Sequence, residues 1–269
     1  MTGAAAGCVL AAGLALAGCG SAASSTGTAT GTSSTDYSTA SAGAATPSSG
    51  TPSPSTSAAA GGGSGSGNIA SVPFPVALGN TWKFKITVGA ENGTTVSKMT
   101  SVVPVSDGQQ VTMTSTNDLL GSTTTTSSTY VFHSDGSIVY PLSQISSGQD
   151  VSVTGNGVVW PPASVIDSGT ASHSDLKLSI KSGGQTISTT AHITVQGAGT
   201  QQVTVPAGTY TATVVNMTEA VAVDGFTVTI VVRTWLAPGV GPVKDEVIEN
   251  EAGTDHVTAT EELKSFTKG

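Results

Sequence analysis

Hydrophobic and polar residues alternate with a period of two along most of the chain after residue 81. In residues 82–88, large hydrophobic side chains at even positions alternate with lysine and threonine at odd positions. A period of two places successive side chains on opposite faces of a β-strand, so this segment predicts a strand with one buried and one hydrated face. The same alternation recurs in segments 102–113, 130–140, 176–187, 221–230 and 247–257.

Short segments rich in glycine, aspartate and asparagine separate these strands. Asn92-Gly93 and Asp224-Gly225 have the composition of two-residue hairpin turns, and Ser106-Asp107-Gly108 and Ser134-Asp135-Gly136 predict two further turns. No window of twelve residues follows a helical period, so helices should be few and short. The pattern predicts an all-β domain over residues 72–269, with about ten to twelve antiparallel strands.

A different pattern occupies the first 18 residues. Residues 4–16 are small or aliphatic and uncharged, too short for the roughly 20 residues that span a bilayer and of the length found in a signal peptide. Leu16, Ala17 and Gly18 then precede Cys19, an arrangement typical of a bacterial lipoprotein. We expect a signal peptidase to recognise these three residues and cleave before Cys19. The Cys19 thiolate would then carry a diacylglycerol that anchors the chain in a membrane.

Residues 19–71 predict a tether. Apart from Asp36 and Tyr37, this segment is almost entirely Ser, Thr, Gly, Ala and Pro. Such a composition cannot bury enough apolar surface to offset the loss of chain entropy, so we expect it to be disordered. As a flexible coil it would span about 40 Å on average.

Charge and cysteine content narrow the functions of the domain. The chain has 9 Lys and Arg against 17 Asp and Glu, a net charge of -8, which disfavours nucleic acid and anionic lipid surfaces as partners. Attachment to a membrane must therefore come from the acyl chains on Cys19. The chain's two cysteines, Cys8 and Cys19, precede the domain, so the domain can form neither a disulfide nor a cysteine-based zinc site.

Catalytic patterns in the domain are weak. Ser174-Asp175-Leu176-Lys177 matches a Ser-x-x-Lys pattern on a predicted hairpin, where that pattern should open a helix. His133, His173, His192 and His256 are isolated from one another in the sequence. We therefore expect no enzymatic activity, no cofactor and no metal site.

Acidic residues are densest between positions 245 and 255. On a strand, Asp245, Glu249 and Glu251 would share one face, so a calcium site at a hairpin tip is one interpretation. A hydrated acidic edge that discourages pairing with other strands is the interpretation we favour. Three tryptophans, Trp82, Trp160 and Trp235, are candidates either for the core or for contact with a ligand.

Three stretches of the domain carry a resemblance to a known family. They are Pro75 to Phe84 (PVALGNTWKF), Val205 to Tyr210 (VPAGTY) and Trp235 to Lys244 (WLAPGVGPVK). Together they resemble the DUF3108-like (TapB-type) group of bacterial envelope proteins. The resemblance implies an open half-barrel or curved sheet on a secreted or lipid-anchored protein. It brings no catalytic residues with it.

These observations predict a lipid-anchored, extracytoplasmic envelope protein whose β-domain binds or presents a partner. The candidate partners are an envelope protein, a polysaccharide or an apolar ligand held by the concave face of the sheet. An alternative is a carrier of a lipid or other apolar ligand, which requires a contiguous apolar cavity under the curved sheet. A scaffold with a filled core is a third function class.

Overall fold

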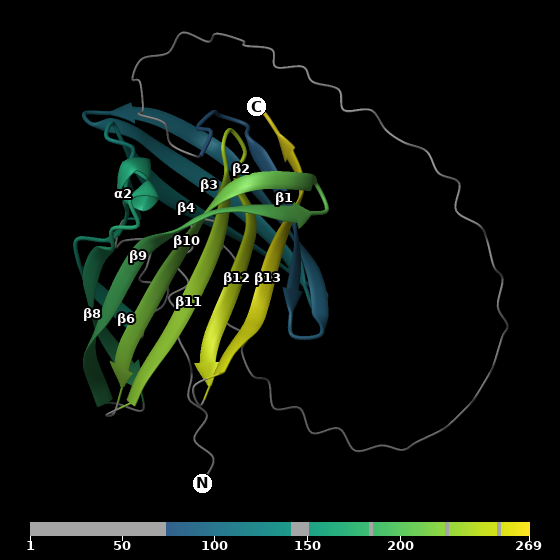
Figure 1. The fold of residues 1–269 in the computed structure, drawn as a ribbon. Coiled ribbons are helices and arrows are strands. Elements are labelled where there is room, and N and C mark those ends of the chain that lie inside the picture. The colour runs from purple at the N-terminus through teal and green to yellow at the C-terminus, as the bar shows by residue number, and fades with distance from the viewer. Residues whose placement is uncertain (1–73, 141–150, 183–184, 224–225, 252–253) are drawn as a thin grey trace, which may run out of the picture. The chain divides into compact units, whose positions relative to one another are not determined.

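The computed structural model describes residues 74–140, 151–182, 185–223, 226–251 and 254–269. The predicted leader, with Leu16, Ala17, Gly18 and Cys19, and the predicted tether of residues 19–71 lie outside these ranges. Within the described ranges, thirteen strands form one antiparallel sheet (Figure 1). The predicted all-β class and curved sheet are confirmed.

The strands have the following bounds. The first seven are β1 (Thr81–Val88), β2 (Glu91–Val105), β3 (Gly108–Leu119), β4 (Ser122–His133), β5 (Ile138–Tyr140), β6 (Val151–Gly155) and β7 (Val158–Trp160). The remaining six are β8 (Ser172–Ser182), β9 (Gln185–Val205), β10 (Gly208–Val223), β11 (Phe226–Ala237), β12 (Gly241–Glu251) and β13 (Thr254–Thr267). β7 has three residues, too few for a recognisable alternation, which is one reason why the sequence predicts fewer strands.

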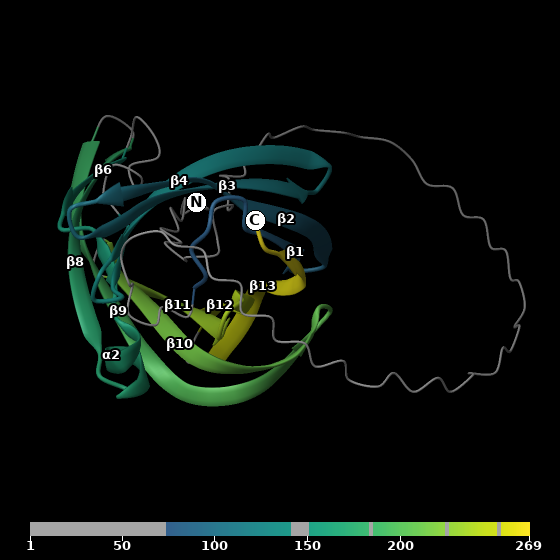
Figure 2. The same cartoon turned by 90° about the horizontal axis from the view of Figure 1, so that it is seen from above.

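The strand order is β6-β8-β9-β10-β11-β12-β13-β1-β2-β3-β4-β5-β7, so the last strand pairs with the first at the middle of the sheet. The sheet curves strongly, and seen from above β2 to β4 lie across from β9 to β11 (Figure 2). Its two ends approach each other where the backbone N–H of Val159 in β7 donates to the hydroxyl of Ser174 in β8 at 3.4 Å. The curvature gives the sheet an inner face and an outer face.

The alternation along each strand decides which side chains form the core. In β1, Trp82, Phe84 and Ile86 are buried on the inner face, whereas Lys83 and Lys85 are exposed on the outer face. Each large aromatic or aliphatic side chain buried this way contributes about 1.5–3 kcal/mol to folding. The predicted two-faced strand is confirmed.

The described helix, α2 (Ala163–Asp167), follows Pro161-Pro162 and has five residues. The described part of the chain therefore contains no helix with the length and apolarity needed to cross a membrane.

The expected turn at Asn92-Gly93 is wrong. β1 ends at Val88 and β2 begins at Glu91, so the chain turns at Gly89, whose φ of +56° favours glycine. Gly93 lies inside β2 opposite Ile86. A Cβ atom on Gly93 would lie 2.4 Å from the carbonyl oxygen of Asp118, so glycine here permits a close approach of β3 and is not a turn residue.

Two of the other predicted turns are confirmed. Turns do separate β2 from β3 at Ser106-Asp107 and β4 from β5 at Ser134-Asp135-Gly136, as predicted. Asp224-Gly225 lies outside the described residues.

The three stretches that carry the family resemblance make contacts around β1 and β13, the neighbouring strands at the middle of the sheet. Trp82, from the first stretch, donates its indole N–H to the carbonyl oxygen of Val240, from the third, at 2.7 Å. The backbone N–H of Ala207, from the second, donates to the carbonyl of Leu263 in β13 at 2.9 Å. Phe74 covers Trp82 at a ring-centroid distance of 5.1 Å. These contacts attach three segments that are far apart in sequence to the two adjacent strands β1 and β13.

Candidate functional site

The three tryptophans singled out in the sequence are buried. Trp82, Trp160 and Trp235 are only 1%, 4% and 6% exposed. The indole N–H of Trp235 donates to Gln201 Oε1 at 3.3 Å, and Lys244 Nζ lies 5.0 Å from the centre of its ring. In this conformation none of these three rings offers a free face to a ligand.

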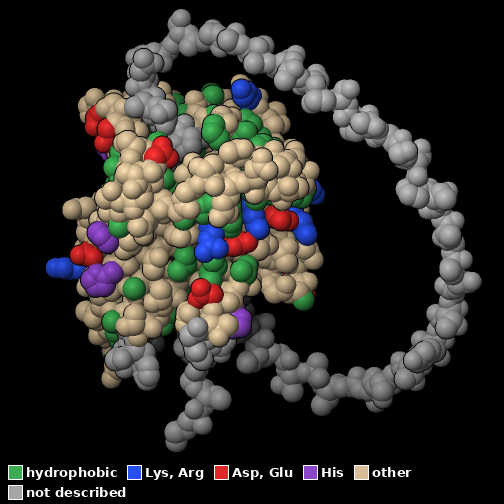
Figure 3. All heavy atoms as spheres, in the orientation of Figure 1, with side chains coloured by type: hydrophobic (Ala, Val, Ile, Leu, Met, Phe, Trp, Pro, Cys, Tyr) green, Lys and Arg blue, Asp and Glu red, His purple; other side chains and the backbone are tan. Residues whose placement is uncertain are grey.

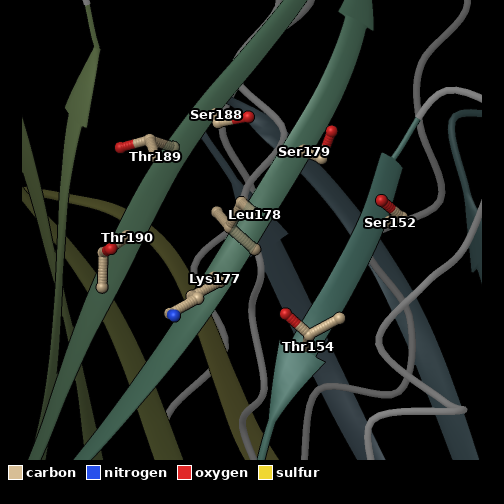
Figure 4. A pocket seen from close by; sticks show the side chains of 8 residues that line it. All are labelled: Ser152, Thr154, Lys177, Leu178, Ser179, Ser188, Thr189 and Thr190. Carbon is tan, nitrogen blue, oxygen red and sulfur yellow. The ribbon is translucent and has the colours of Figure 1, made fainter.

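A shallow groove runs across the outer face of β6, β8 and β9 at one end of the sheet (Figure 4). It has a volume of about 350 Å³. The strand registers place its outward side chains in two transverse rows, Ser152, Ser179 and Ser188 in one and Thr154, Lys177 and Thr190 in the next. The groove is therefore an array of hydroxyl groups around one ammonium group.

The sequence builds this groove through the same alternation that builds the core. Leu176 and Leu178 in β8 are buried on the inner face, so Lys177 and Ser179 point outward. Each hydroxyl can donate one hydrogen bond and accept two, and the Lys177 ammonium can donate three. The arrangement can hold a ligand that carries many hydroxyl groups and a negative charge.

A second polar cluster continues along the same face from the Lys177 row. His192 Nδ1 lies 2.7 Å from Asp175 Oδ1, and His173 Nδ1 lies 3.1 Å from the Thr194 hydroxyl. In the space-filling view, histidine, acidic and basic side chains lie together over β8 at the left margin (Figure 3). Both members of the His192–Asp175 pair are more than 60% exposed, so the pair adds polar contacts to the surface and little stability.

The weak catalytic patterns do not assemble. Ser174 lies on the inner face of β8 and accepts a hydrogen bond from Val159, whereas Lys177 points to the outer face. His133 pairs with Asp107 at 3.1 Å in an exposed turn region. Across the described ranges, no three side chains of the His, Cys, Asp and Glu types gather as metal ligands.

A second concavity of about 310 Å³ lies among β11, β12 and β13, lined by Thr227, Thr229, Val231, Ile248, Asn250 and Asp255. It is also largely polar. Neither concavity is the apolar cavity that the lipid-carrier alternative requires.

The acidic segment 245–255 does not form the exposed edge that we expected from the sequence. Asp245 is 1% exposed on the inner face, whereas Glu249 is exposed and Glu246 points outward to Lys244, with an Oε1–Nζ distance of 2.8 Å. The proposed convergence of acidic side chains at a hairpin tip is therefore wrong for Asp245. Asp245 instead lies directly opposite Glu261 of β13.

Asp245 and Glu261 belong to a band of buried polar side chains that crosses the inner face. Its members share burial on strands that are otherwise apolar on this face: Thr95, Ser97, Ser115, Asn117, Thr234, Asp245 and Glu261. Thr95 Oγ1 lies 2.7 Å from Asn117 Oδ1 and 3.0 Å from Glu261 Oε1, and Thr234 donates to Asp245 Oδ1 at 2.5 Å. Burial raises the pKa of Asp245 to about 7.

Sequence analysis missed this band. The only available signal was the parity of Thr95 and Ser97, which fall on the same side of β2 as the buried Met99. Serine and threonine are common on both faces of strands. The alternation alone therefore does not show that Thr95 and Ser97 are buried.

Comparisons with known proteins support the fold. A family model described as DUF3108-like matches residues 79–255. A crystal structure from Bacteroides fragilis, assigned as an exported protein with a YmcC-like fold, is 19% identical, with a TM-score of 0.50 over 72% of this chain and 98% of that chain. Another, assigned as a lipoprotein from Parabacteroides distasonis, is 17% identical, with a TM-score of 0.52 over 73% and 99%. No curated protein matches the chain at a significant level.

Proposed function

The chain belongs to the DUF3108-like family, and from this premise we propose that it is an exported, lipid-anchored protein whose β-domain is a binding module of the cell envelope. The leader that ends at Cys19 supports this location, and one structural neighbour is assigned as exported and the other as a lipoprotein. Acyl chains on Cys19 would hold the protein at the membrane. Residues 19–71 would let the domain move away from the membrane surface.

Although the chain as a whole carries a net charge of -8, the ligand that best fits the outer groove is a polysaccharide whose acidic groups contact the Lys177 ammonium group locally. The observation that carries this proposal is the pair of rows around Lys177, because they present hydroxyl groups and one cation on an exposed strand surface. Among the described lining residues Leu178 alone is apolar, and it is buried. The groove therefore lacks the aromatic or aliphatic anchors on which protein partners usually depend.

The lipid-carrier alternative has weaker support. The two concavities described above are lined mainly by residues with polar side chains, chiefly serine and threonine, and neither is enclosed by apolar side chains. The inner face also carries a buried polar band, in which Asp245 Oδ2 and Glu261 Oε2 lack a hydrogen-bond partner that a purely apolar ligand could not supply.

Binding to defined oligosaccharides tests the polysaccharide proposal. The full chain, purified in detergent, is titrated with oligogalacturonate as an acidic probe and with a neutral dextran oligomer, and heat is measured by calorimetry. We expect oligogalacturonate to bind more tightly than dextran, and Lys177→Ala to weaken its binding about tenfold, the value of one charge-assisted hydrogen bond. Lys85→Ala, which removes an exposed lysine from β1, is the matched control and should leave binding unchanged. Equal affinity of the wild type and Lys177→Ala for oligogalacturonate, or no binding at millimolar concentration, would contradict the proposal.

A further inference from the structure

Two buried carboxylate oxygens on the inner face have no hydrogen-bond partner. Asp245 and Glu261 lie opposite each other on β12 and β13, and they are 1% and 3% exposed. Asp245 Oδ1 accepts a hydrogen bond from Thr234, and Glu261 Oε1 lies 3.0 Å from Thr95 Oγ1, whose single proton it shares with Asn117 Oδ1 at 2.7 Å. Asp245 Oδ2 and Glu261 Oε2 are left without a donor or acceptor. Buried polar atoms are nearly always satisfied in native proteins, so this pair requires an explanation.

Neighbouring basic residues do not neutralise the pair. Lys244 and Glu246, which flank Asp245 in β12, point to the outer face and pair with each other there, and Arg233 lies 3.9 Å from the same Glu246. Two carboxylates buried side by side without a cation carry a large desolvation and repulsion cost. A positive species bound between them would replace this repulsion with attraction and offset the cost of desolvation.

Protons can neutralise the two carboxylates but give the two free oxygens no partner. A proton on Asp245 Oδ2 or Glu261 Oε2 would create a hydroxyl donor, and neither atom has an acceptor within hydrogen-bond distance. A metal ion contacts several oxygens at once and needs no acceptor. Directly opposed residues of an antiparallel pair have Cβ atoms about 4.5–5.5 Å apart, so their carboxylates can converge on one ion with ligand distances of about 2.3–2.6 Å.

We propose that Asp245 and Glu261 bind one calcium ion on the inner face of the sheet. The potential donors around them are all oxygens: the two carboxylates, the Thr95 and Thr234 hydroxyls and the Asn117 side-chain carbonyl. An oxygen donor set of this kind suits a hard cation, and a flexible one suits Ca²⁺ better than Mg²⁺, which demands near-ideal octahedral geometry. Two carboxylates balance the charge of one divalent ion. The bound ion would link the polar band across β11, β12, β13, β2 and β3.

Calcium content and thermal stability of the full chain test this proposal. Protein is treated with EDTA and then dialysed against CaCl₂ at about 1 mM. It should retain about one calcium per chain, measured by atomic emission. Its Tm should be roughly 5 °C or more above the Tm in EDTA. MgCl₂ should raise the Tm less. Asp245→Asn and Glu261→Gln should each lose the retained calcium and the rise in Tm. Asp175→Asn, which alters an exposed carboxylate, is the matched control and should keep both.

Three results would overturn the calcium site: wild-type protein that retains no calcium, wild-type protein with the same Tm in EDTA and in calcium, and an Asp245→Asn variant that retains as much calcium as the wild type. The first two use unaltered protein, so the proposal stays testable even when a variant fails to fold. None of these results depends on the outer groove, so they test the ion site independently of polysaccharide binding.

Discussion

The indole N–H of Trp82 donates to the carbonyl oxygen of Val240 at 2.7 Å, across 158 residues of sequence. Trp82 lies in β1, and Val240 lies in the turn between β11 and β12. The Trp82 ring also stacks on Phe266 of β13 with 5.0 Å between ring centroids. One side chain thus connects the first strand, the last strand and the turn between β11 and β12 at the middle of the strand order.

Trp82→Phe tests the contribution of this hydrogen bond. The phenyl ring keeps most of the contact with Phe74 and Phe266 but leaves the Val240 carbonyl without its indole donor. We expect a loss of about 1–3 kcal/mol in the free energy of unfolding, measured by urea denaturation. Trp82→Ala should lower the free energy of unfolding by about 3–5 kcal/mol, because it also leaves a cavity where the indole ring packs. Equal stability of Trp82→Phe and wild type would show that the hydrogen bond contributes nothing.

Gly89 and Gly93 should respond differently to the same substitution. Gly89 has a positive φ and open space around its Cβ position, and asparagine tolerates that conformation, so Gly89→Asn should change stability by less than about 1 kcal/mol. Gly93→Asn should lower the free energy of unfolding by more than about 2 kcal/mol, because its Cβ atom would clash with the Asp118 carbonyl oxygen. Urea midpoints of the two variants provide the measurement. The reverse order would place the turn at Asn92-Gly93 after all.

Ala207→Pro removes the backbone donor that attaches the tip of the β9–β10 hairpin to Leu263 of β13. We expect faster amide exchange in the residues flanking the tip, with little change in β1 to β4, measured by hydrogen exchange and mass spectrometry. Ala207→Gly keeps the N–H group and is the control. Unchanged exchange in Ala207→Pro would mean that the tip is held by side-chain packing alone.

Stability should fall as the pH rises in calcium-free buffer. Burial raises the pKa of Asp245 to about 7 and that of Glu219 to about 7, and burial together with the Asp245 charge raises the pKa of Glu261 to about 8. These values exceed the ordinary ones of 3.8 and 4.5, so the folded state binds more protons than the unfolded chain between about pH 4 and pH 8. The stabilisation from protonation is complete below about pH 4 and is lost as the pH rises to about 8.

Urea unfolding of EDTA-treated protein at a series of pH values measures this loss, which should total a few kcal/mol. Asp245→Asn combined with Glu261→Gln should flatten most of the slope, because neither amide titrates. Asp175→Asn should leave it unchanged. A wild-type stability that rises from pH 5 to pH 8 without calcium would show that these carboxyls are ionised in the folded protein.

The sequence predicts the positions of the strands better than the roles of individual residues within them. The alternation at Trp82, Phe84 and Ile86 specifies β1 and its buried face, because burial requires a period of two on a strand. The error at Gly93 arises because glycine serves both hairpin turns and close strand approach, and only the neighbouring β3 backbone decides between them. Local patterns therefore identify elements, whereas contacts between elements decide the roles of individual glycines.

The outer groove and the Asp245–Glu261 pair could not be predicted, for the same physical reason. Ser152, Ser179 and Ser188 come from three strands, and only the register brings them into one row. In the sequence, Asp245 groups with the acidic residues that follow it. Its actual partner, Glu261, comes from the next strand, where the register of β12 and β13 sets it directly opposite.

The mass of the N-terminal peptide of the mature protein tests the account most directly. The chain is expressed in a bacterium that processes lipoproteins, extracted from its membranes and digested, and the N-terminal peptide is identified by mass spectrometry. The account predicts a peptide that begins at Cys19 and carries a diacylglycerol on its sulfur. A mature peptide that retains residues 1–18, or one that begins elsewhere with an unmodified cysteine, would contradict the proposal that this β-domain is a lipid-anchored module of the cell envelope.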